Sequence, residues 1–551
     1  MTARLAIALA QTDPKVGDVA GNLARIRAAR AEAAALGADL IVFSELVVAG
    51  YPPEDLVLKP AFQDACRKAV EALAGDTADG GPGMIVGAPW VENAKLHNSA
   101  LLLDAGKIAA IRHKHELPNY GVFDEKRVFA SGPLPGPVVF RGVRLGLMIC
   151  EDMWFPDSAE CLVESGAELL VVPNGSPFET DKLDERIALA GRRVAETGLP
   201  LIYVNQVGGQ DELVFDGASF VLNADRDRAA QCSAFAEHVA LTRWEKGEKG
   251  WACVEGPRAP TPDASGAIYA ALVLGLRDYV AKNRFPGTIL GLSGGIDSAL
   301  TAAIAADALG PDKVRAVMMP SRYTSRESLE DAAACAKLLG IAYETISIEP
   351  AVDAFGAMLA GAFAGTNSGI AEENIQSRAR GLTLMALSNK FGHMVVSTGN
   401  KSEMSAGYAT LYGDMCGGFA VLKDVYKTTV FELSRWRNAN RPEGALGPRG
   451  PVMPERVIVK PPTAELREGQ TDEASLGPYA RLDAILRALV EGEKTVAEVV
   501  AAGYAEDEVR RVWRMLDLAE YKRRQAPPGV KITRRAFGRE RRYPIVNGFR
   551  G

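Results

Sequence analysis

The segment GLSGGIDS contains residue types that can grip a phosphate group. It lies between the apolar run TILGL, which predicts a buried strand, and SALTAAIAADALG, which predicts a helix. Backbone N–H groups at a helix N-terminus favour an anion, glycines allow close approach, and serine hydroxyls add donors. The pattern therefore predicts a nucleotide phosphate site formed by Gly291, Leu292, Ser293, Gly294, Gly295, Ile296, Asp297 and Ser298.

The chain has no GxxxxGK[ST] motif, so the lysine that a Walker loop directs at the terminal phosphates is missing. Transfer of the γ-phosphoryl group is therefore not the expected chemistry. The S-G-G-x-D-S loop resembles that of the pyrophosphatase-type ATP enzymes, which form an adenylate and release pyrophosphate. This resemblance implies that Asp297 helps to hold Mg²⁺ against the phosphates of ATP. The loop alone leaves open NAD, GMP, asparagine and argininosuccinate synthetases and tRNA-thiolating enzymes.

Three segments in the first half of the chain contain the parts of an amidase. Cys150 ends the apolar run VRLGLMIC, Glu45 lies near the end of DLIVFSEL, and Lys114 lies in HKHELPNYGVFDEKRVF. A thiol becomes a useful nucleophile when a base takes its proton and a cation stabilises the negative charge that develops. Glu45 can be that base and Lys114 that cation. The three residues together predict amide hydrolysis through a thioester.

These segments resemble the nitrilase superfamily, and the resemblance covers about the first 250 residues. It implies an α-β-β-α sandwich with a catalytic Glu, Lys and Cys. On this chain Glu45 would be the general base and Cys150 would form the thioester. Lys114 and the backbone N–H after Cys150 would stabilise the oxyanion. Glu125 is expected to support Lys114 and Glu45.

The length of 551 residues predicts two domains, since hydrophobic cores stop growing near roughly 250 to 300 residues. The run EGPRAPTPDASG interrupts the strand and helix pattern, so we expect domains at 1–258 and 259–551. In the second domain, strand and helix patterns alternate from TILGL to AYETISI. This order predicts a doubly wound parallel sheet with its ligand at the carboxyl ends of the strands.

Four further blocks follow the phosphate loop: EENIQSRARG, VVSTGNKSE, YATLYGDMCGGFAVLKDVYKT and KPPTAELREGQTDE. With these blocks behind a nitrilase-type amidase, the chain resembles the glutamine-dependent NAD synthetase family over nearly its whole length. The resemblance implies ATP-dependent amidation of deamido-NAD to NAD, with ammonia released from L-glutamine. An adenylated intermediate is expected, and AMP, pyrophosphate and glutamate are the expected products.

The same resemblance implies binding residues for each substrate. Glutamine contacts are expected at Tyr120, Glu151, Ser176 and Lys182. ATP contacts beyond the loop are expected at Thr398 and Lys427. Contacts to deamido-NAD are expected at Asn374, Glu403 and Lys522, with Glu403 also a Mg²⁺ ligand beside Asp297. Asp414 lies in a block of the family, but the sequence assigns it no role.

Composition and charge exclude several other classes of protein. The net charge of −6 provides no overall attraction to nucleic acid. The seven cysteines form no CxxC pair, which argues against a zinc site or a disulfide framework. The N-terminus lacks the pattern of a secretory signal, and no apolar run is long enough for a membrane span. We therefore expect a cytoplasmic enzyme with small-molecule substrates, and the resemblance implies a homo-oligomer built on a synthetase-domain dimer.

Two alternatives remain on the sequence. The first is another glutamine amidotransferase with the same type of loop, which activity on xanthosine monophosphate or aspartate instead of deamido-NAD would reveal. The second is an amidase fused to a nucleotide sensor that performs no synthesis. The presence of Asp297, Thr398, Glu403 and Lys427 together argues against the sensor, because a sensor does not need metal and leaving-group machinery.

Overall fold

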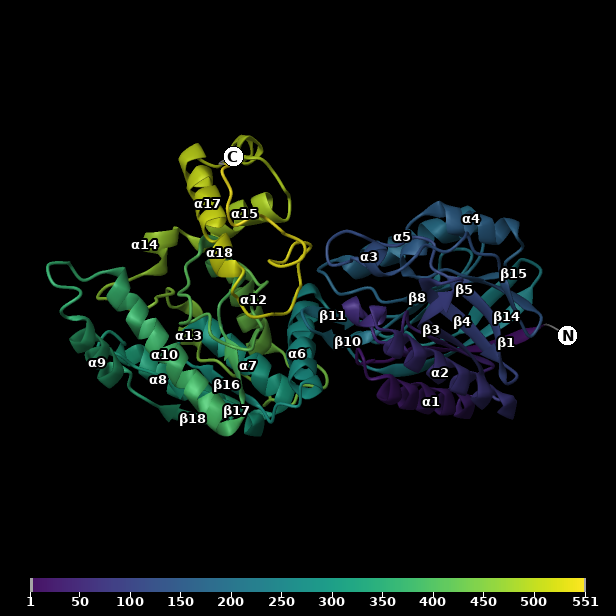
Figure 1. The fold of residues 1–551 in the computed structure, drawn as a ribbon, viewed down its shortest axis with the longest axis horizontal. Helices are drawn as coiled ribbons and strands as arrows, with labels where there is room; N and C mark the ends of the chain where they lie inside the picture. Colours follow the sequence, from purple (N-terminus) through teal and green to yellow (C-terminus); the bar gives the residue numbers. More distant parts are fainter. Residues whose placement is uncertain (1–2, 550–551) are drawn as a thin grey trace. The chain divides into compact units, whose positions relative to one another are not determined.

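The chain folds into two compact units in a computed structural model that describes residues 3–549. The first unit ends at Pro262 and the second begins at Asp263. This division falls inside the run EGPRAPTPDASG, whose prolines and glycines disfavour a continuous helix or strand. Each unit has its own sheets and hydrophobic cores (Figure 1). Within residues 3–549, no helix combines the length and apolar character needed to cross a membrane.

The first unit contains two large sheets and a small ribbon. The seven-stranded sheet has the order β15 (Gly250–Glu255), β14 (His238–Gly247), β1 (Arg4–Gln11), β2 (Leu40–Phe43), β3 (Gly83–Glu92), β4 (Lys95–Asp104) and β5 (Lys107–His113). The six-stranded sheet has the order β13 (Arg228–Gln231), β12 (Phe220–Leu222), β9 (Leu201–Asn205), β8 (Leu169–Asn174), β7 (Val143–Leu147) and β6 (Val138–Phe140). The ribbon pairs β10 (Val207–Gln210) with β11 (Leu213–Asp216).

Alternation along the strands separates the cores of the first unit, because successive side chains in a strand point to opposite faces. On β1, Ile7 belongs to the core between the two sheets. Its neighbour Ala8 shares a different core with helices α1 (Val19–Ala35) and α2 (Pro60–Asp76). These two helices therefore cover the outer face of the seven-stranded sheet (Figure 1).

The six-stranded sheet shows the same division between its faces. On β8, Val171 belongs to the core between the sheets, whereas Val172 shares a core with helices α4 (Pro156–Glu164) and α5 (Lys182–Thr197). The layers of this unit are thus helix, sheet, sheet and helix. The α-β-β-α sandwich predicted for the first half of the chain is confirmed.

The second unit is built on a five-stranded sheet whose paired strands are all parallel. Its order is β18 (Ala342–Thr345), β17 (Val314–Met318), β16 (Thr288–Gly291), β19 (Met394–Ser397) and β20 (Phe419–Ala420). The strand order reverses direction between β16 and β19, and ligands of such sheets bind at this switch point. The predicted doubly wound parallel sheet is confirmed, and the loop with the glycines directly follows β16.

The larger helices of the second unit flank this sheet (Figure 1). They are α6 (Ala264–Lys282), α7 (Ile296–Leu309), α8 (Arg326–Leu339), α9 (Glu349–Leu359), α10 (Ile370–Phe391) and α12 (Lys427–Ala439). The shorter helices near the site are α11 (Lys401–Ala406), α13 (Glu455–Val459) and α14 (Asp472–Leu476). A helical cluster with its own apolar core follows, formed by α15 (Tyr479–Val490), α16 (Val496–Ala501), α17 (Glu506–Leu518) and α18 (Glu520–Arg523).

Candidate active sites

The predicted amidase residues meet at the ends of strands from both sheets of the first unit. Glu45 follows β2, Lys114 follows β5, and Cys150 follows β7. The Nζ atom of Lys114 lies 2.7 Å from Glu45 Oε1 and 2.8 Å from Oε1 of Glu125, the first residue of α3 (Glu125–Val128). All four side chains are buried. Residues separated by up to about a hundred positions in sequence therefore form one desolvated cluster.

Hydrogen bonds orient the two carboxylates of this cluster. Asn98 Nδ2 donates to Glu45 Oε1 at 2.7 Å, and the backbone N–H of Gly175 donates to Glu45 Oε2 at 2.9 Å. The Tyr51 hydroxyl donates to Glu125 at 2.8 Å. Two carboxylates share one ammonium group, and burial raises the pKa of Glu125 to about 7. The geometry supports Glu45 as the oriented base and Glu125 as a partner of Lys114.

Cys150 has a neutral thiol and an unusual backbone. Burial raises the pKa of its thiol well above the ordinary value; the Glu45 carboxylate adds to this rise and Lys114 opposes it. The thiol therefore needs a base before it can attack an amide. Its φ of 47° lies in the left-handed region, which costs a residue other than glycine about 1 to 2 kcal/mol. Strain of this kind is found where a nucleophile is held on a sharp turn, here at the start of η3 (Cys150–Met153).

The side chains beside the nucleophile offer opposite charges. The hydroxyl of Tyr120 donates to Glu151 at 2.9 Å, and Glu151 directly follows Cys150. Lys182 lies with its Nζ 4.5 Å from the centre of the Trp154 ring and 3.0 Å from a carboxylate oxygen of Glu185. A glutamine molecule has an α-ammonium and an α-carboxylate group. A carboxylate acceptor and a nearby ammonium donor are the complementary protein groups.

In the second unit the predicted phosphate loop forms a compact turn held by its own serines. The backbone N–H of Ser293 donates to Ser298 Oγ at 3.1 Å, and the Ser298 hydroxyl donates to the carbonyl of Gly295 at 2.9 Å. Gly294 has a φ of 79°, and a Cβ atom there would lie 2.3 Å from the carbonyl oxygen of Ser328. Only glycine fits this position. The turn leads directly into α7, whose N-terminus favours a phosphate.

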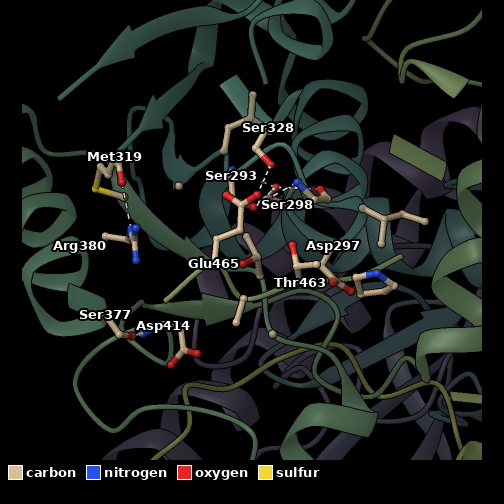
Figure 2. Close-up of a pocket in the computed structure, with 18 of the residues that line it drawn as sticks. Ser293, Asp297, Ser298, Met319, Ser328, Ser377, Arg380, Asp414, Thr463 and Glu465 are labelled. Atoms are coloured by element: carbon tan, nitrogen blue, oxygen red, sulfur yellow. Dashed lines mark hydrogen bonds between the residues drawn. The ribbon is translucent and has the colours of Figure 1, made fainter. Parts of the chain in front are cut away.

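A cavity of about 270 Å³ opens beside this loop at the predicted switch point. Figure 2 shows residues from both ends of this lining, with Ser293 and Asp297 from the loop and Arg380 and Asp414 from more distant segments. Among the predicted ATP and deamido-NAD positions, the lining residues are Gly291, Leu292, Ser293, Gly295, Ile296, Asp297, Ser298, Thr398, Glu403 and Lys427.

Asp297 and Glu403 face a single ammonium group in this cavity. Lys427 forms an ion pair with Asp297, and its Nζ lies 3.5 Å from Glu403. Asn400 Nδ2 donates to Asp297 at 2.9 Å. Burial and the charge of Asp297 raise the pKa of Glu403 to about 8. Two carboxylates share one ammonium group, so Glu403 favours its protonated form until a further cation is present.

These carboxylates suit a hard divalent cation, which prefers oxygen ligands. No third acidic, histidine or cysteine side chain completes a metal-binding group with them in residues 3–549. A Mg²⁺ ion at Asp297 and Glu403 would therefore take its other ligands from phosphate oxygens and water, as is usual for this ion. The donor set fits the predicted cofactor on these terms.

Comparison with known proteins matches each unit and the whole chain. The NAD synthase family matches residues 268–526, and the carbon-nitrogen hydrolase family matches residues 6–245. The glutamine-dependent NAD(+) synthetase of Rhodobacter capsulatus is 50% identical over 550 residues, which cover 100% of both chains. The chain belongs to the glutamine-dependent NAD(+) synthetase family.

Solved structures of this family agree with the assignment. The glutamine-dependent NAD(+) synthetase of Acinetobacter baumannii, solved in complex with adenosine diphosphate, is 44% identical with a TM-score of 0.79 and 99% coverage of both chains. A further relative, compared by sequence alone, is the glutamine-dependent NAD(+) synthetase of Thermotoga maritima, which is 41% identical over 580 aligned positions that cover 99% of each chain. As a member of this family the chain is a ligase with a glutaminase domain of nitrilase type, and its synthesis depends on ATP.

Two of the predicted deamido-NAD contacts do not reach the cavity of this synthetase. Asn374 and Lys522 are outside the described lining of the cavity. Asn374 Oδ1 accepts a hydrogen bond from the Thr410 hydroxyl at 2.9 Å, and Lys522 Nζ donates to the carbonyls of Gly407 and Ala409, both at 2.7 Å. Asp414 does line the cavity, and burial raises its pKa to about 6.

An arginine that no sequence pattern indicated holds Ser176 in this family member. Arg186 is fully buried, and its Nε donates to Ser176 Oγ at 3.0 Å. Its Nη2 donates to the carbonyls of Ser176 and Pro177, and its Nη1 lies 2.8 Å from Asp216. Because Ser176 Oγ accepts from Arg186, the serine's own proton is available to another acceptor. An arginine in an amphipathic helix pattern looks solvent-exposed in sequence, so nothing there indicated this role.

Two cavity residues of the synthetase unit were also missed. Arg380 is in the block EENIQSRARG and donates through Nε to the carbonyl of Met319 at 3.0 Å. Glu465 is in KPPTAELREGQTDE and accepts a hydrogen bond from the Ser325 hydroxyl at 2.6 Å. It also accepts one from the Ser328 hydroxyl at 2.8 Å (Figure 2). Both blocks resemble those of the family in sequence. Their residues carry no spacing pattern that would reveal a cavity.

Proposed function

We propose that the two units of this chain divide one synthesis between them. The glutaminase domain, 1–258, releases ammonia from L-glutamine, and the synthetase domain, 259–551, uses it to convert deamido-NAD to NAD. The observation that carries this proposal is the presence, in one chain, of the buried Glu45, Lys114 and Cys150 cluster and the phosphate-loop cavity. Full-length similarity to named glutamine-dependent NAD(+) synthetases supports it.

In the first unit, Glu45 takes the proton of the Cys150 thiol, and the sulfur attacks the carboxamide carbon of glutamine. Lys114 Nζ and the backbone N–H of Glu151 stabilise the oxyanion that forms. The C–N bond breaks as Glu45 returns the proton to the leaving nitrogen, which departs as ammonia. Glu45 then takes a proton from water, whose oxygen attacks the thioester to release glutamate and restore the thiol. Glu125 keeps Lys114 in place throughout.

Four residues hold glutamine for this reaction. Glu151 and Tyr120 accept the α-ammonium group, since Glu151 presents a carboxylate next to the nucleophile. Ser176 and Lys182 bind the α-carboxylate with a hydroxyl and an ammonium donor. Lysine acts as a point charge, without the two-pronged geometry of arginine. Ser176, which Arg186 fixes in place, would therefore provide much of the orientation.

In the second unit, the loop Gly291–Ser298 binds the phosphates of ATP, with Thr398 and Lys427 as further contacts. The nicotinate carboxylate of deamido-NAD attacks the α-phosphorus, and pyrophosphate leaves. Ammonia then attacks the activated carbonyl carbon and AMP leaves, which gives the amide of NAD. Mg²⁺ held by Asp297 and Glu403 would offset the phosphate charge when bound. The ADP in the Acinetobacter baumannii structure supports binding of an adenine nucleotide by this chain.

Asn374, Glu403 and Lys522 are the proposed contacts to deamido-NAD. Glu403 lies in the cavity itself. Asn374 and Lys522 would influence deamido-NAD binding through the segment that includes Gly407, Ala409 and Thr410, because their side chains form hydrogen bonds with it. This segment leads to Asp414 in the lining of the cavity.

Product analysis tests the proposed reaction. With ATP, magnesium, deamido-NAD and glutamine, we expect AMP and pyrophosphate in equal amounts with NAD. ADP and orthophosphate as primary products would contradict the adenylate. Parallel assays with xanthosine monophosphate and aspartate test the rival amidotransferases, and absence of pyrophosphate with every substrate would indicate the nucleotide sensor.

We also propose that the protein assembles through its synthetase domain. Helix α9 is strongly apolar, yet none of its residues is buried in the single chain. Met358 on α9 and Ile370 on α10 are 73% and 76% exposed, and Leu382 on α10 is 64% exposed. Exposed apolar surface of this kind marks an interaction site. Light scattering should give a mass at least twice that of the chain, and Met358→Asp should lower it.

A cytoplasmic location stays a prediction from the cysteine pattern.

A further inference from the structure

We propose that Asp152 is a positioning residue of the glutaminase site, which ties the Cys150 segment to the segment of Lys114. The inference rests on the proposed roles of Cys150 and Lys114, and it gives a function to a residue outside the catalytic set. Asp152 lies two positions after the nucleophile and is 2% exposed.

Both carboxylate oxygens of Asp152 are used by backbone donors on the two segments. Oδ2 accepts from the N–H of Ile149, the residue before Cys150, at 2.8 Å. Oδ1 accepts from the N–H groups of His115 and Glu116, which follow Lys114, at 2.9 and 2.8 Å. One buried side chain thus fixes the residue before the nucleophile and the two residues after the catalytic lysine.

These bonds close a ring of contacts around the catalytic cluster. The backbone N–H of Lys114 donates to the carbonyl of Asn98 at 2.8 Å. The side chain of Asn98 in turn donates to Glu45 at 2.7 Å. Without Asp152, the base and the lysine would remain connected through Asn98. The turn that carries Cys150 would lose its direct tie to them.

The chemistry of the donors explains why a carboxylate is present. Three N–H groups converge from opposite sides, and only a side chain with acceptors at both ends satisfies all of them. An asparagine would turn its NH₂ group toward at least one N–H. A buried charge is costly, so it is retained where its hydrogen bonds fix a needed geometry. The backbone of Cys150 is strained, since its φ lies in the left-handed region, and Asp152 helps to hold the turn that contains it.

The test uses full-length variants Asp152→Asn and Asp152→Glu. Asparagine replaces one of the two acceptor oxygens with an NH₂ group, whereas glutamate keeps the charge and moves it by one methylene. The matched control is Asn223→Ala, which removes another side-chain clamp of the same unit: Asn223 accepts from the N–H of Cys253 at 2.8 Å and donates to its carbonyl at 3.0 Å. Cys150→Ala in the same series tests the nucleophile assignment independently.

Each variant is assayed for glutamine-dependent and ammonium-dependent synthesis. The variants that keep Cys150 are also assayed for the pH profile of Cys150 alkylation by iodoacetamide. Asp152→Asn should lower the glutamine-dependent kcat about 100-fold, with KM for glutamine changed less than about twofold, because a small misplacement of catalytic groups has effects of this size. The alkylation profile should move to higher pH, since Lys114 would stabilise the thiolate less. Ammonium-dependent synthesis should be retained, and Asp152→Glu should show the same pattern with a smaller loss.

Three results would overturn the proposal. One is an alkylation profile and kcat equal to those of Asn223→Ala, which would make Asp152 a structural clamp only. Another is a rise in KM for glutamine without a fall in kcat. The third applies if Asp152→Asn does not fold: a folded Asp152→Glu with unchanged kcat and profile would exclude positioning. If Cys150→Ala still uses glutamine, the proposed function itself has failed, whatever Asp152 does.

Discussion

The two sites of this protein differ in how complete they are before a substrate binds. In the first unit, Glu45, Lys114 and Glu125 are buried, and Lys114 lies 2.7 Å from Glu45 and 2.8 Å from Glu125. In the second, a cavity of about 270 Å³ separates the phosphate loop from Arg380 and Asp414. At its metal end, Asp297 is held by an ion pair with Lys427 and by a hydrogen bond from Asn400.

The difference follows from what each site must do. Hydrolysis of a small amide needs a base, a cation and a thiol at fixed positions in a dry environment, so protein groups can satisfy one another in advance. Two nucleotides bring their own charges and several phosphates. A site for them must leave donors and carboxylates open to ligand and metal. A substitution in one site should therefore have effects that can be told apart from those of a substitution in the other.

The largest expected effect is that of Cys150→Ala. It removes the only proposed attacking atom, so glutamine-dependent synthesis should fall by at least about 1,000-fold. Synthesis from ammonium chloride should persist, most clearly at raised pH, where more ammonia is unprotonated. Both rates are measured at saturating ATP and deamido-NAD. Loss of both in a folded protein would show that the two sites are not chemically separable.

Asp297→Ala should impair the synthetase site of the second unit. It removes a carboxylate that Lys427 and the proposed Mg²⁺ share, and activation precedes amination. Synthesis from either nitrogen source should therefore fall about 100- to 1,000-fold, the size expected for a lost electrostatic partner at the reacting group. Asp312→Ala, at an exposed position of the same unit, is the control. Full ammonium-dependent activity in Asp297→Ala would assign that residue a structural role only.

Arg186→Lys should weaken glutamine binding without reaching the synthetase site. Lysine keeps a charge near Asp216, but it cannot bond Ser176 and Asp216 in the forked geometry of arginine. KM for glutamine should rise about tenfold, the size of one charge-assisted hydrogen bond. Arg243→Lys, at an exposed position of β14, provides the comparison. An equal loss with ammonium would mean that the substitution disrupts the whole chain.

The smallest effect is expected for Lys522→Ala. Its ammonium group holds the carbonyls of Gly407 and Ala409, so its loss should loosen the segment proposed to contact deamido-NAD. We expect KM for deamido-NAD to rise only about threefold, because the two lost hydrogen bonds would act on the substrate through this segment and not by direct contact. Lys494→Ala, an exposed lysine in the same unit, should leave this KM unchanged. A lower melting temperature with an unaltered KM would instead make Lys522 a structural clasp.

Local sequence determined much of the architecture and the reacting groups. The run TILGL followed by GLSGGIDS predicted the strand, turn and helix of the phosphate loop, because glycine chemistry and apolar periodicity act over a few residues. Motif resemblance likewise indicated Glu45, Lys114 and Cys150, and the fold classes of both units. These features depend on contacts close in sequence or on blocks that a family shares.

Tertiary structure alone decided which ordinary polar residues support those groups. Arg186 occupies a helix that reads as amphipathic, and only the packing of α5 against β8 and β9 buries its guanidinium beside Ser176. Asp152 binds backbone groups 36 and 37 residues away, and Glu465 reaches hydroxyls 137 and 140 residues away. Hydrogen bonds across such distances leave no periodic trace in the sequence, because the fold, and not local spacing, brings donor and acceptor together.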